Sequence, residues 1–184
     1  MTVARVVVRP ATPGDAAAIA LVHVASWRAA YAGIVPATVL DNLSVERREA
    51  SWQETTANPG DVATWVAVLD GNVVGFASGG PHRDDDLPID VGELWSIYVD
   101  PGAWGRRAGS ALFDHAVAGL VHRGFASLVL WVLTANERGR RFYDHRGWRP
   151  DGAARMLDFD GTPVEEMRYR LRQAARQRGD RTIG

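Results

Sequence analysis

The 184-residue chain carries 21 Lys and Arg against 22 Asp and Glu, a formal net charge of -1, so it has no overall field that would gather nucleic acid. Hydrophobic residues make up 46% of it, yet no apolar run approaches the roughly 20 residues of a membrane helix. Because the chain has no Cys, a disulfide framework and a thiolate metal site are excluded, and a reducing cytoplasm is expected. The N-terminal stretch is too short and then too polar for a secretory signal.

The first part of the chain predicts one strand followed by helices. VARVVVRP is Val-rich and ends at a Pro, as strands often do. Thr12 and Asp15, with a Pro between them, resemble a capping box that opens a helix over residues 16–31, and Gly33 ends it. Two further helices are expected over residues 36–43 and 44–56.

The next block changes to the period of strands. VATWVAVLD and NVVGFASGG are β-rich runs separated by Asp70-Gly71-Asn72, which predicts a hairpin. PHRDDDLPID lacks periodicity and indicates a loop. VGELWSIYVD then predicts another strand, which ends before Pro101.

The second half alternates between helices and strands. RRAGSALFDHAVAGLVHRG has apolar residues at helical spacing, ASLVLWVL is typical of a strand buried on both faces, and Asn136 opens another helix that Gly147 closes. WRPDGAARMLDF and EEMRYRL predict two final strands. The order indicates an α+β (mixed α/β) domain over residues 1–171, with a mostly antiparallel sheet of about seven strands flanked by about four helices. A polar tail is expected over residues 172–184.

The stretch VDPGAWGRRAGSAL leaves an apolar strand, passes a Pro, and enters a helix with Arg106 and Arg107 in its first turn. The N-H groups at a helix N-terminus have no partner within the helix, and the helix dipole adds positive charge there, so such a turn attracts an anion. The P-loop and G-x-G-x-x-G patterns are both absent. The turn therefore suits a pyrophosphate. Alternatively, Gly105 and Gly109 serve only turn geometry and close helix packing, with both Arg solvated.

YVDPGAWGRRAGSALFDHA and LTANERGRRFYDHRGW together resemble the two cofactor motifs of the GCN5-related N-acetyltransferase (GNAT) superfamily. The order of elements from about Val3 to Leu171 resembles that fold as well. The family's usual pattern at the turn is Arg or Gln, then x-x-Gly-x-Gly or Ala, whereas here Trp104 opens it and Arg107 replaces the central Gly. The backbone donors survive an Arg if φ stays negative, and the Arg adds a cation for a phosphate.

The resemblance implies acetyl-CoA as the cofactor, with coenzyme A as the product. The strand before the turn would pair with the pantetheine arm through Ile97, Tyr98 and Val99. Asn136 matches the Asn that contacts the cofactor beside the thioester. The pyrophosphate would lie on the amides of Gly105, Arg106, Arg107, Ala108, Gly109 and Ser110.

Acetyl transfer to an amine requires a neutral nitrogen, and a primary amine of pKa about 10.4 is almost wholly protonated at neutral pH. Glu93 resembles the family's Glu that takes the proton through water. An apolar setting beside Trp95 would favour that role, whereas the alternative is a solvated carboxylate at a strand end. The N-H of Val99 is expected to face the carbonyl oxygen. Tyr143 matches the family's general acid, which protonates the departing thiolate; the alternative is an aromatic side chain packed beside Phe142.

Trp27, Tyr31 and Trp95 are candidates for the wall of an acceptor pocket, or for core. The Asp84 to Asp86 run either attracts a cationic amine or forms a solvated loop, which is the commoner state of three consecutive Asp. The five His show no metal-ligand spacing, and the C-terminal Arg residues, Arg168 among them, suggest a solvated strand and tail. The expected function is N-acetylation of a small-molecule amine. The alternatives are acetylation of a protein N-terminus or lysine, and a non-catalytic acetyl-CoA-binding regulatory module. No nucleic-acid or membrane partner is expected, and a homodimer is suggested by analogy alone.

Overall fold

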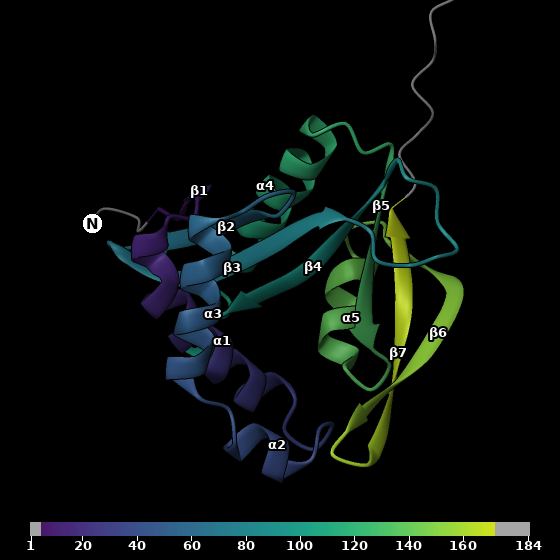
Figure 1. The fold of residues 1–184 in the computed structure, drawn as a ribbon, viewed down its shortest axis with the longest axis horizontal. Coiled ribbons are helices and arrows are strands. Elements are labelled where there is room, and N and C mark those ends of the chain that lie inside the picture. Colours follow the sequence, from purple (N-terminus) through teal and green to yellow (C-terminus); the bar gives the residue numbers. More distant parts are fainter. Residues whose placement is uncertain (1–4, 172–184) are drawn as a thin grey trace, which may run out of the picture.

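One twisted sheet organises residues 5–171, which are the residues described by the computed structural model (Figure 1). Its strands follow the order β1-β2-β3-β4-β5-β7-β6. The tail predicted for residues 172–184 lies outside the described residues. In chain order the elements are β1 (Val7–Pro10), α1 (Ala16–Ala30), α2 (Ala37–Asp41), α3 (Val45–Ala57), β2 (Ala63–Leu69), β3 (Asn72–Pro81), β4 (Val91–Val99), α4 (Ala108–His122), β5 (Ser127–Leu133), α5 (Glu137–Asp144), β6 (Arg149–Phe159) and β7 (Thr162–Leu171), with short 3-10 helices at Pro13–Asp15 and Pro101–Ala103.

The predicted α+β architecture is confirmed. All neighbouring strands pair antiparallel except β4 and β5, which are parallel. Residues 5–171 contain the seven strands that were expected, and five α-helices where about four were expected. The hairpin predicted at Asp70-Gly71 is present, and both residues have positive φ, at 51° and 82°, as a two-residue hairpin turn of this kind requires.

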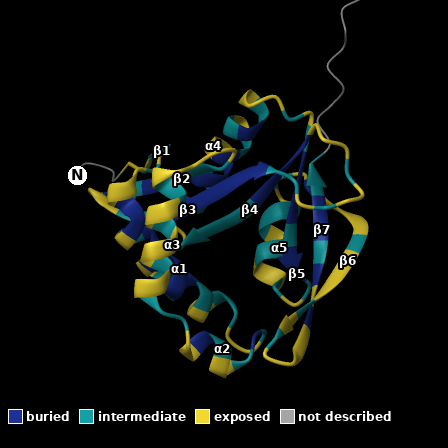
Figure 2. Cartoon of the chain, viewed as in Figure 1, coloured by how far each residue is buried: buried dark blue, intermediate teal, exposed yellow. Residues whose placement is uncertain are grey.

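Helices cover both faces of the sheet. Leu112 and Leu120 of α4 are fully buried in a core formed against β2, β3, β4 and β5. On the opposite face, Ile19 and Val22 of α1 pack against Phe76 of β3. Figure 2 shows β3 buried along most of its length between these layers. Packing on both faces therefore holds β3 in place beside the point at which β4 and β5 diverge.

The parallel pair β4 and β5 separates after a short contact. Within the described chain, their pairing ends at Glu93 and Val129, and Figure 1 shows the two strands spreading apart beyond that point. A register shift between β3 and β4 pairs Ser78 with Ser96 but Gly79 with Leu94, so Trp95 is an extra, bulged residue. Because a bulge bends and twists its strand, it turns β4 away from β5. The result is an open wedge inside a continuous sheet.

The beginning of α4 differs from the prediction. The helix starts at Ala108, so Arg106 and Arg107 precede it and do not belong to its first turn. Arg107 has φ 65° and ψ 0°, which is the left-handed region. The condition of a negative φ at this Arg is therefore not met. The backbone conformation at this position favours Gly, which gives a physical reason for the Gly in the pattern that this turn resembles.

Candidate active site

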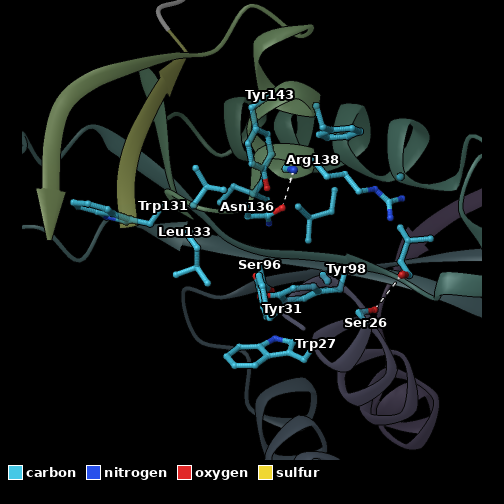
Figure 3. A pocket seen from close by; sticks show the side chains of 18 of the residues that line it. Ser26, Trp27, Tyr31, Ser96, Tyr98, Trp131, Leu133, Asn136, Arg138 and Tyr143 are labelled. Carbon is cyan, nitrogen blue, oxygen red and sulfur yellow. Dashed lines mark hydrogen bonds between the residues drawn. The ribbon is translucent and has the colours of Figure 1, made fainter. Parts of the chain in front are cut away.

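A cavity of about 500 Å³ fills the wedge between β4 and β5. Its wall comes from α1, β4, the turn before α4, β5, α5 and β6 (Figure 3). The structure brings together nearly all of the predicted site residues. Arg106 and Ala108 are the exceptions, since the former is exposed and the latter is buried beneath the turn. The predicted residues that line the cavity are Trp27, Tyr31, Glu93, Trp95, Ile97, Tyr98, Val99, Gly105, Arg107, Gly109, Ser110, Asn136 and Tyr143.

The turn before α4 leaves its backbone donors open. Ala111 N-H donates to Arg107 O at 3.0 Å, so the N-H groups of the preceding helical residues have no acceptor within the helix. No side chain caps this terminus. Gly105 has φ 78° and serves the turn, but a Cβ on Gly109 would approach its neighbours no closer than 3.6 Å. Close packing therefore does not explain Gly109, and the terminus is free to bind an anion.

The open edge of β4 offers further donors. Asp100 N-H donates to Val74 O of β3 at 2.8 Å. Because backbone groups alternate in direction along a strand, the N-H groups of Val99 and Ile97 point to the other side, into the wedge. The carbonyl of Val99 already accepts from Ser26 Oγ at 3.1 Å and from Trp104 Nε1 at 2.8 Å. The N-H groups, and not this carbonyl, are available to a ligand.

Asn136 is the N-cap of the short helix α5, and Tyr143 lies within that helix. Asn136 Oδ1 caps the helix by accepting from Gly139 N-H at 3.0 Å, and none of the described groups accepts from its Nδ2. Tyr143 lies in the last turn of α5, and its side chain extends toward Asn136 (Figure 3). Burial raises the pKa of the Tyr143 hydroxyl well above its usual value, and the nearby Tyr98 adds to the effect. Tyr143 therefore keeps its proton at neutral pH.

Glu93 occupies a setting that the sequence did not predict. It is only 1% exposed, so it is not a solvated carboxylate. Nor is its setting apolar, because Arg83 Nη2 donates to Oε1 at 2.7 Å and the Arg83 backbone N-H donates to Oε2 at 3.0 Å. Trp95 does lie beside it, with the Arg83 guanidinium 5.0 Å from the Trp95 ring centroid. Nothing in the local sequence marks Arg83, which the chain supplies from the loop after β3.

Aromatic side chains form the end of the cavity opposite the α4 turn. The Tyr31 and Tyr98 hydroxyls lie 3.0 Å apart, and Trp27 meets Tyr31 edge to face. Burial raises the pKa of both Tyr31 and Tyr98. Leu157 and Phe159 of β6, which are not among the predicted site residues, complete this wall. Their alternation with charged residues along that strand is the signal that places both on one face.

The acidic loop is solvated only in part. Asp84, whose side chain is 8% exposed, pairs with both Arg155 and Arg168 at 3.2 Å. Asp85 and Asp86 are exposed as expected, although Asp86 also pairs with Arg168 at 2.7 Å. Arg168 is 5% exposed, and its hydrogen bonds to Asp86 first, then Asp151 and Asp84, raise its pKa above the usual value. The prediction of a solvated Arg168 is therefore wrong.

The described residues offer neither a metal centre nor a membrane-spanning helix. No group of three or more His, Cys, Asp or Glu among them is arranged to hold a metal ion. None of the described helices has the length and apolar character needed to cross a membrane.

The fold agrees with that of known proteins. Residues 27–148, which include the end of α1, the wedge and α5, match the Acetyltransferase (GNAT) family. The chain belongs to this family. The N-acetyltransferase YuaI of Bacillus subtilis is 37% identical over 132 residues, 71% of this chain and 73% of that protein. A probable N-acetyltransferase of Mycobacterium tuberculosis is 26% identical over 173 residues, 91% of this chain and 94% of that protein.

Solved GNAT structures share the fold at low sequence identity. The ribosomal-protein-alanine N-acetyltransferase of Brucella melitensis superposes with a TM-score of 0.72 at 22% identity, covering 91% of this chain and 99% of that one. The acetyltransferase yncA of Salmonella typhimurium, solved with its cofactor acetyl-CoA, gives 0.68 at 19% identity, covering 96% and 98%. Acetyl-CoA is the donor that enzymes of this family use, so the predicted cofactor and N-acetyltransferase class are confirmed at the level of the family.

Proposed function

We propose that this GNAT enzyme transfers an acetyl group from acetyl-CoA to the primary amine of a small molecule, by direct attack within a ternary complex. The observation that carries the proposal is a hydrophobic cluster beside the aromatic end of the cavity. This cluster joins the segment after α1 to strands β5 and β7. Val35 and Leu40, which follow α1, pack with Leu133 and Val164 of β5 and β7. Figure 1 places α2 next to the tip of the β6 and β7 hairpin. A closed end suits a small acceptor, whereas a polypeptide needs an open groove.

The wall of this end supports the same conclusion. Trp27, Tyr31, Leu157 and Phe159 line the cavity and also pack against that cluster, so the cluster fixes the shape of the pocket. Aromatic walls give an acceptor large contact area with few polar demands. The carboxylates that line the cavity are Glu93 and Glu166, and each is already paired with an arginine. A single amine on a compact body therefore fits this end better than a polycation.

The wedge fits the cofactor. Acetyl-CoA, when bound, would supply a thioester, and the amine would attack its carbonyl carbon. The open N-H group of Ile97 would pair with a pantetheine amide, and those at the start of α4 would hold the pyrophosphate. The Nδ2 group of Asn136 would donate to the cofactor near the thioester, since its Oδ1 is used by the helix cap.

Three groups of the chain would manage charge during transfer. Glu93, through a water molecule, takes the proton that leaves the acceptor ammonium, so that the nitrogen lone pair is free. Val99 N-H donates toward the carbonyl oxygen as it gains negative charge. Tyr143 gives its proton to the sulfur as the carbon-sulfur bond breaks, and is reprotonated by the second proton released from the new amide nitrogen. The balance is one amide, one thiol and one proton.

The experiment combines calorimetric titration with turnover. Acetyl-CoA, desulfo-CoA and ADP are titrated into the protein, and thiol release with product mass is then followed for three acceptor sets: arylalkylamines and amino acids, polyamines, and peptides with free N-termini or lysines. Binding of acetyl-CoA and turnover of the first set are expected. Turnover of peptides alone would overturn the small-molecule assignment, and binding without turnover of any set would favour a regulatory module.

A further inference from the structure

The two ends of the cavity differ in how their arginines are paired. At the acceptor end, Arg83 pairs with Glu93, and Arg155 pairs with Glu166 at 2.6 Å. At the α4 end, none of the lining or flanking arginines lies within salt-bridge distance of a described carboxylate. These arginines are Arg106, Arg107 and Arg138. These arginines have no partner among the described carboxylates and lie around an uncapped helix N-terminus. The arrangement indicates that an anionic ligand supplies the negative charge there.

Arg138 is the most constrained of the three. Its guanidinium carbon lies 3.4 Å from the centroid of the Trp104 ring, which is stacking distance. Desolvation lowers the pKa of Arg138 from its usual value, and no carboxylate counteracts that effect. In Figure 3 the side chain extends from the α5 side of the cavity toward the end at which Ser26 lies. Arg138 thus spans the wedge from one wall to the other.

Trp104 holds the other side of this contact. Its Nε1 donates to Val99 O at 2.8 Å, which anchors the indole to the end of β4. Position 104 is the first of the turn, where the pattern that the turn resembles has Arg or Gln. This chain has Trp104 at that position and no polar side chain. The cation is instead Arg138 of α5, two residues after Asn136, which stacks on Trp104.

We infer that Arg138, held in place by the Trp104 indole, binds the pyrophosphate of acetyl-CoA across the wedge and replaces the polar side chain that the turn lacks. This inference rests on the proposed function, because it requires that the cofactor occupy the wedge. A guanidinium presents a planar set of donors that matches phosphate oxygens. The indole face leaves the guanidinium edge free to donate. Arg138 is thus a cofactor-binding residue and Trp104 a positioning residue.

The test compares donors that differ in their phosphates. Binding is measured by calorimetry for S-acetylpantetheine, S-acetyl-4′-phosphopantetheine, acetyl-dephospho-CoA and acetyl-CoA, with the wild type and Arg138→Ala. Charge-assisted hydrogen bonds are strong enough that the variant should raise the Kd of acetyl-CoA and of acetyl-dephospho-CoA alike by about tenfold or more. The Kd of S-acetylpantetheine should not change. Arg138→Lys should recover part of the loss, because it restores the charge without the planar stack.

Arg141→Ala is the matched control. Arg141 lies on the same helix, is 66% exposed in its side chain and pairs only with Glu137, so its loss should change none of the four Kd values by more than about twofold. Trp104→Ala should weaken acetyl-CoA binding in the wild type but add little in the Arg138→Ala background, because the two residues act through one contact.

The outcomes separate the inference from the function on which it rests. If the wild type fails to bind acetyl-CoA at all, the proposed function itself is overturned. If the wild type binds and Arg138→Ala binds equally well, only the inference fails. A loss seen with acetyl-CoA but not with acetyl-dephospho-CoA would assign Arg138 to the 3′-phosphate and overturn the pyrophosphate assignment.

Discussion

The carboxylate of Glu93 lies 2.7 Å from the guanidinium of Arg83, although the Glu93 side chain is 2% exposed and that of Arg83 is 59% exposed. A loop residue therefore holds the buried group through both carboxylate oxygens, since the Arg83 backbone N-H donates to the second one at 3.0 Å. Ion pairing at one end fixes the orientation of the carboxylate toward the cavity. Any role of Glu93 as a base depends on this loop.

Replacement of Glu93 by Gln tests that role. The amide keeps the shape of the side chain but cannot take up the amine proton, so kcat/KM should fall by about a hundredfold. Steady-state kinetics of purified variant and wild type measure the effect. Glu166→Gln is the control, because Glu166 is also buried, lines the same cavity and pairs with an arginine. If Glu166→Gln loses this activity and Glu93→Gln does not, the base is Glu166.

Replacement of Tyr143 by Phe removes the proposed proton donor alone. Burial raises the pKa of Tyr143 above its usual value, so the hydroxyl is protonated across the neutral range. Because a thiol, with a pKa of about 8.5, is the stronger acid, transfer of the Tyr143 proton to the sulfur is uphill and requires the coupled return of a proton from the new amide nitrogen. We expect kcat to fall by about a hundredfold and the Kd of acetyl-CoA to change by less than about twofold. Tyr169→Phe serves as control, since Tyr169 is a buried neighbour outside the cavity wall. An equal loss in both variants would indicate a packing effect and remove Tyr143 as the acid.

Replacement of Arg107 by Gly relieves a strained backbone. Arg107 has φ 65°, and a left-handed conformation costs a residue with a Cβ about 1 to 2 kcal/mol. Arg107→Gly should therefore raise the melting temperature, offset in part by the greater freedom of Gly in the unfolded chain. Arg106→Gly is the matched variant, because Arg106 is not among the positive-φ residues, and it should gain nothing. Thermal unfolding of the two variants decides the matter, and a lower melting temperature for Arg107→Gly would show that the side chain stabilises the turn.

Local patterns of the sequence were sufficient for the fold. Asp70-Gly71 was expected to turn the chain between strands, and both residues have positive φ. Asn136 was expected to open a helix, and it caps α5. These features depend on residues within a few positions of one another, so short-range turn and capping chemistry determines them.

The contacts that the sequence did not predict join distant parts of the chain. Arg168 and Asp84 are 84 positions apart, and Arg155 and Asp84 are 71 apart. A run of charges has the same appearance whether it is solvated or paired, because the pairing depends on how the sheet places β6 and β7 beside the loop. The stacking of Arg138 on Trp104 has the same origin: it requires α5 and the turn before α4 to face each other across the wedge.

Arg168 should be essential to stability. It pairs with Asp84 and Asp151, whose side chains are 8% and 13% exposed. Arg168→Met keeps much of the volume but leaves these carboxylates without their cation, and breaking a buried pair in this way costs about 3 to 5 kcal/mol. Arg170→Met is the comparison, since Arg170 has a single long contact of 3.6 Å with Asp151 and should cost less than about 1 kcal/mol. Urea unfolding measures both, and equal losses would show that Arg168 contributes no more than an ordinary surface arginine.

Asp15 should make stability depend on pH at acidic values. The hydrogen bond from Arg9 is the main cause that lowers the pKa of Asp15 from 3.8 to about 2, and bonds from Thr12 assist while burial opposes. Because the folded state binds this proton less readily than the unfolded state, the stabilisation is fully present above the unfolded pKa and is lost as pH falls through the folded pKa. Its size is on the order of 1 to 2 kcal/mol, after a discount for the partly exposed Arg9. Other carboxylates titrate in the same range, so the informative quantity is the difference between wild type and Asp15→Asn. That difference in melting temperature should be constant above about pH 5 and close as the pH falls from about 4 to about 2. A gap that stays constant down to pH 2 would mean that Asp15 acts through shape and capping and not through its charge.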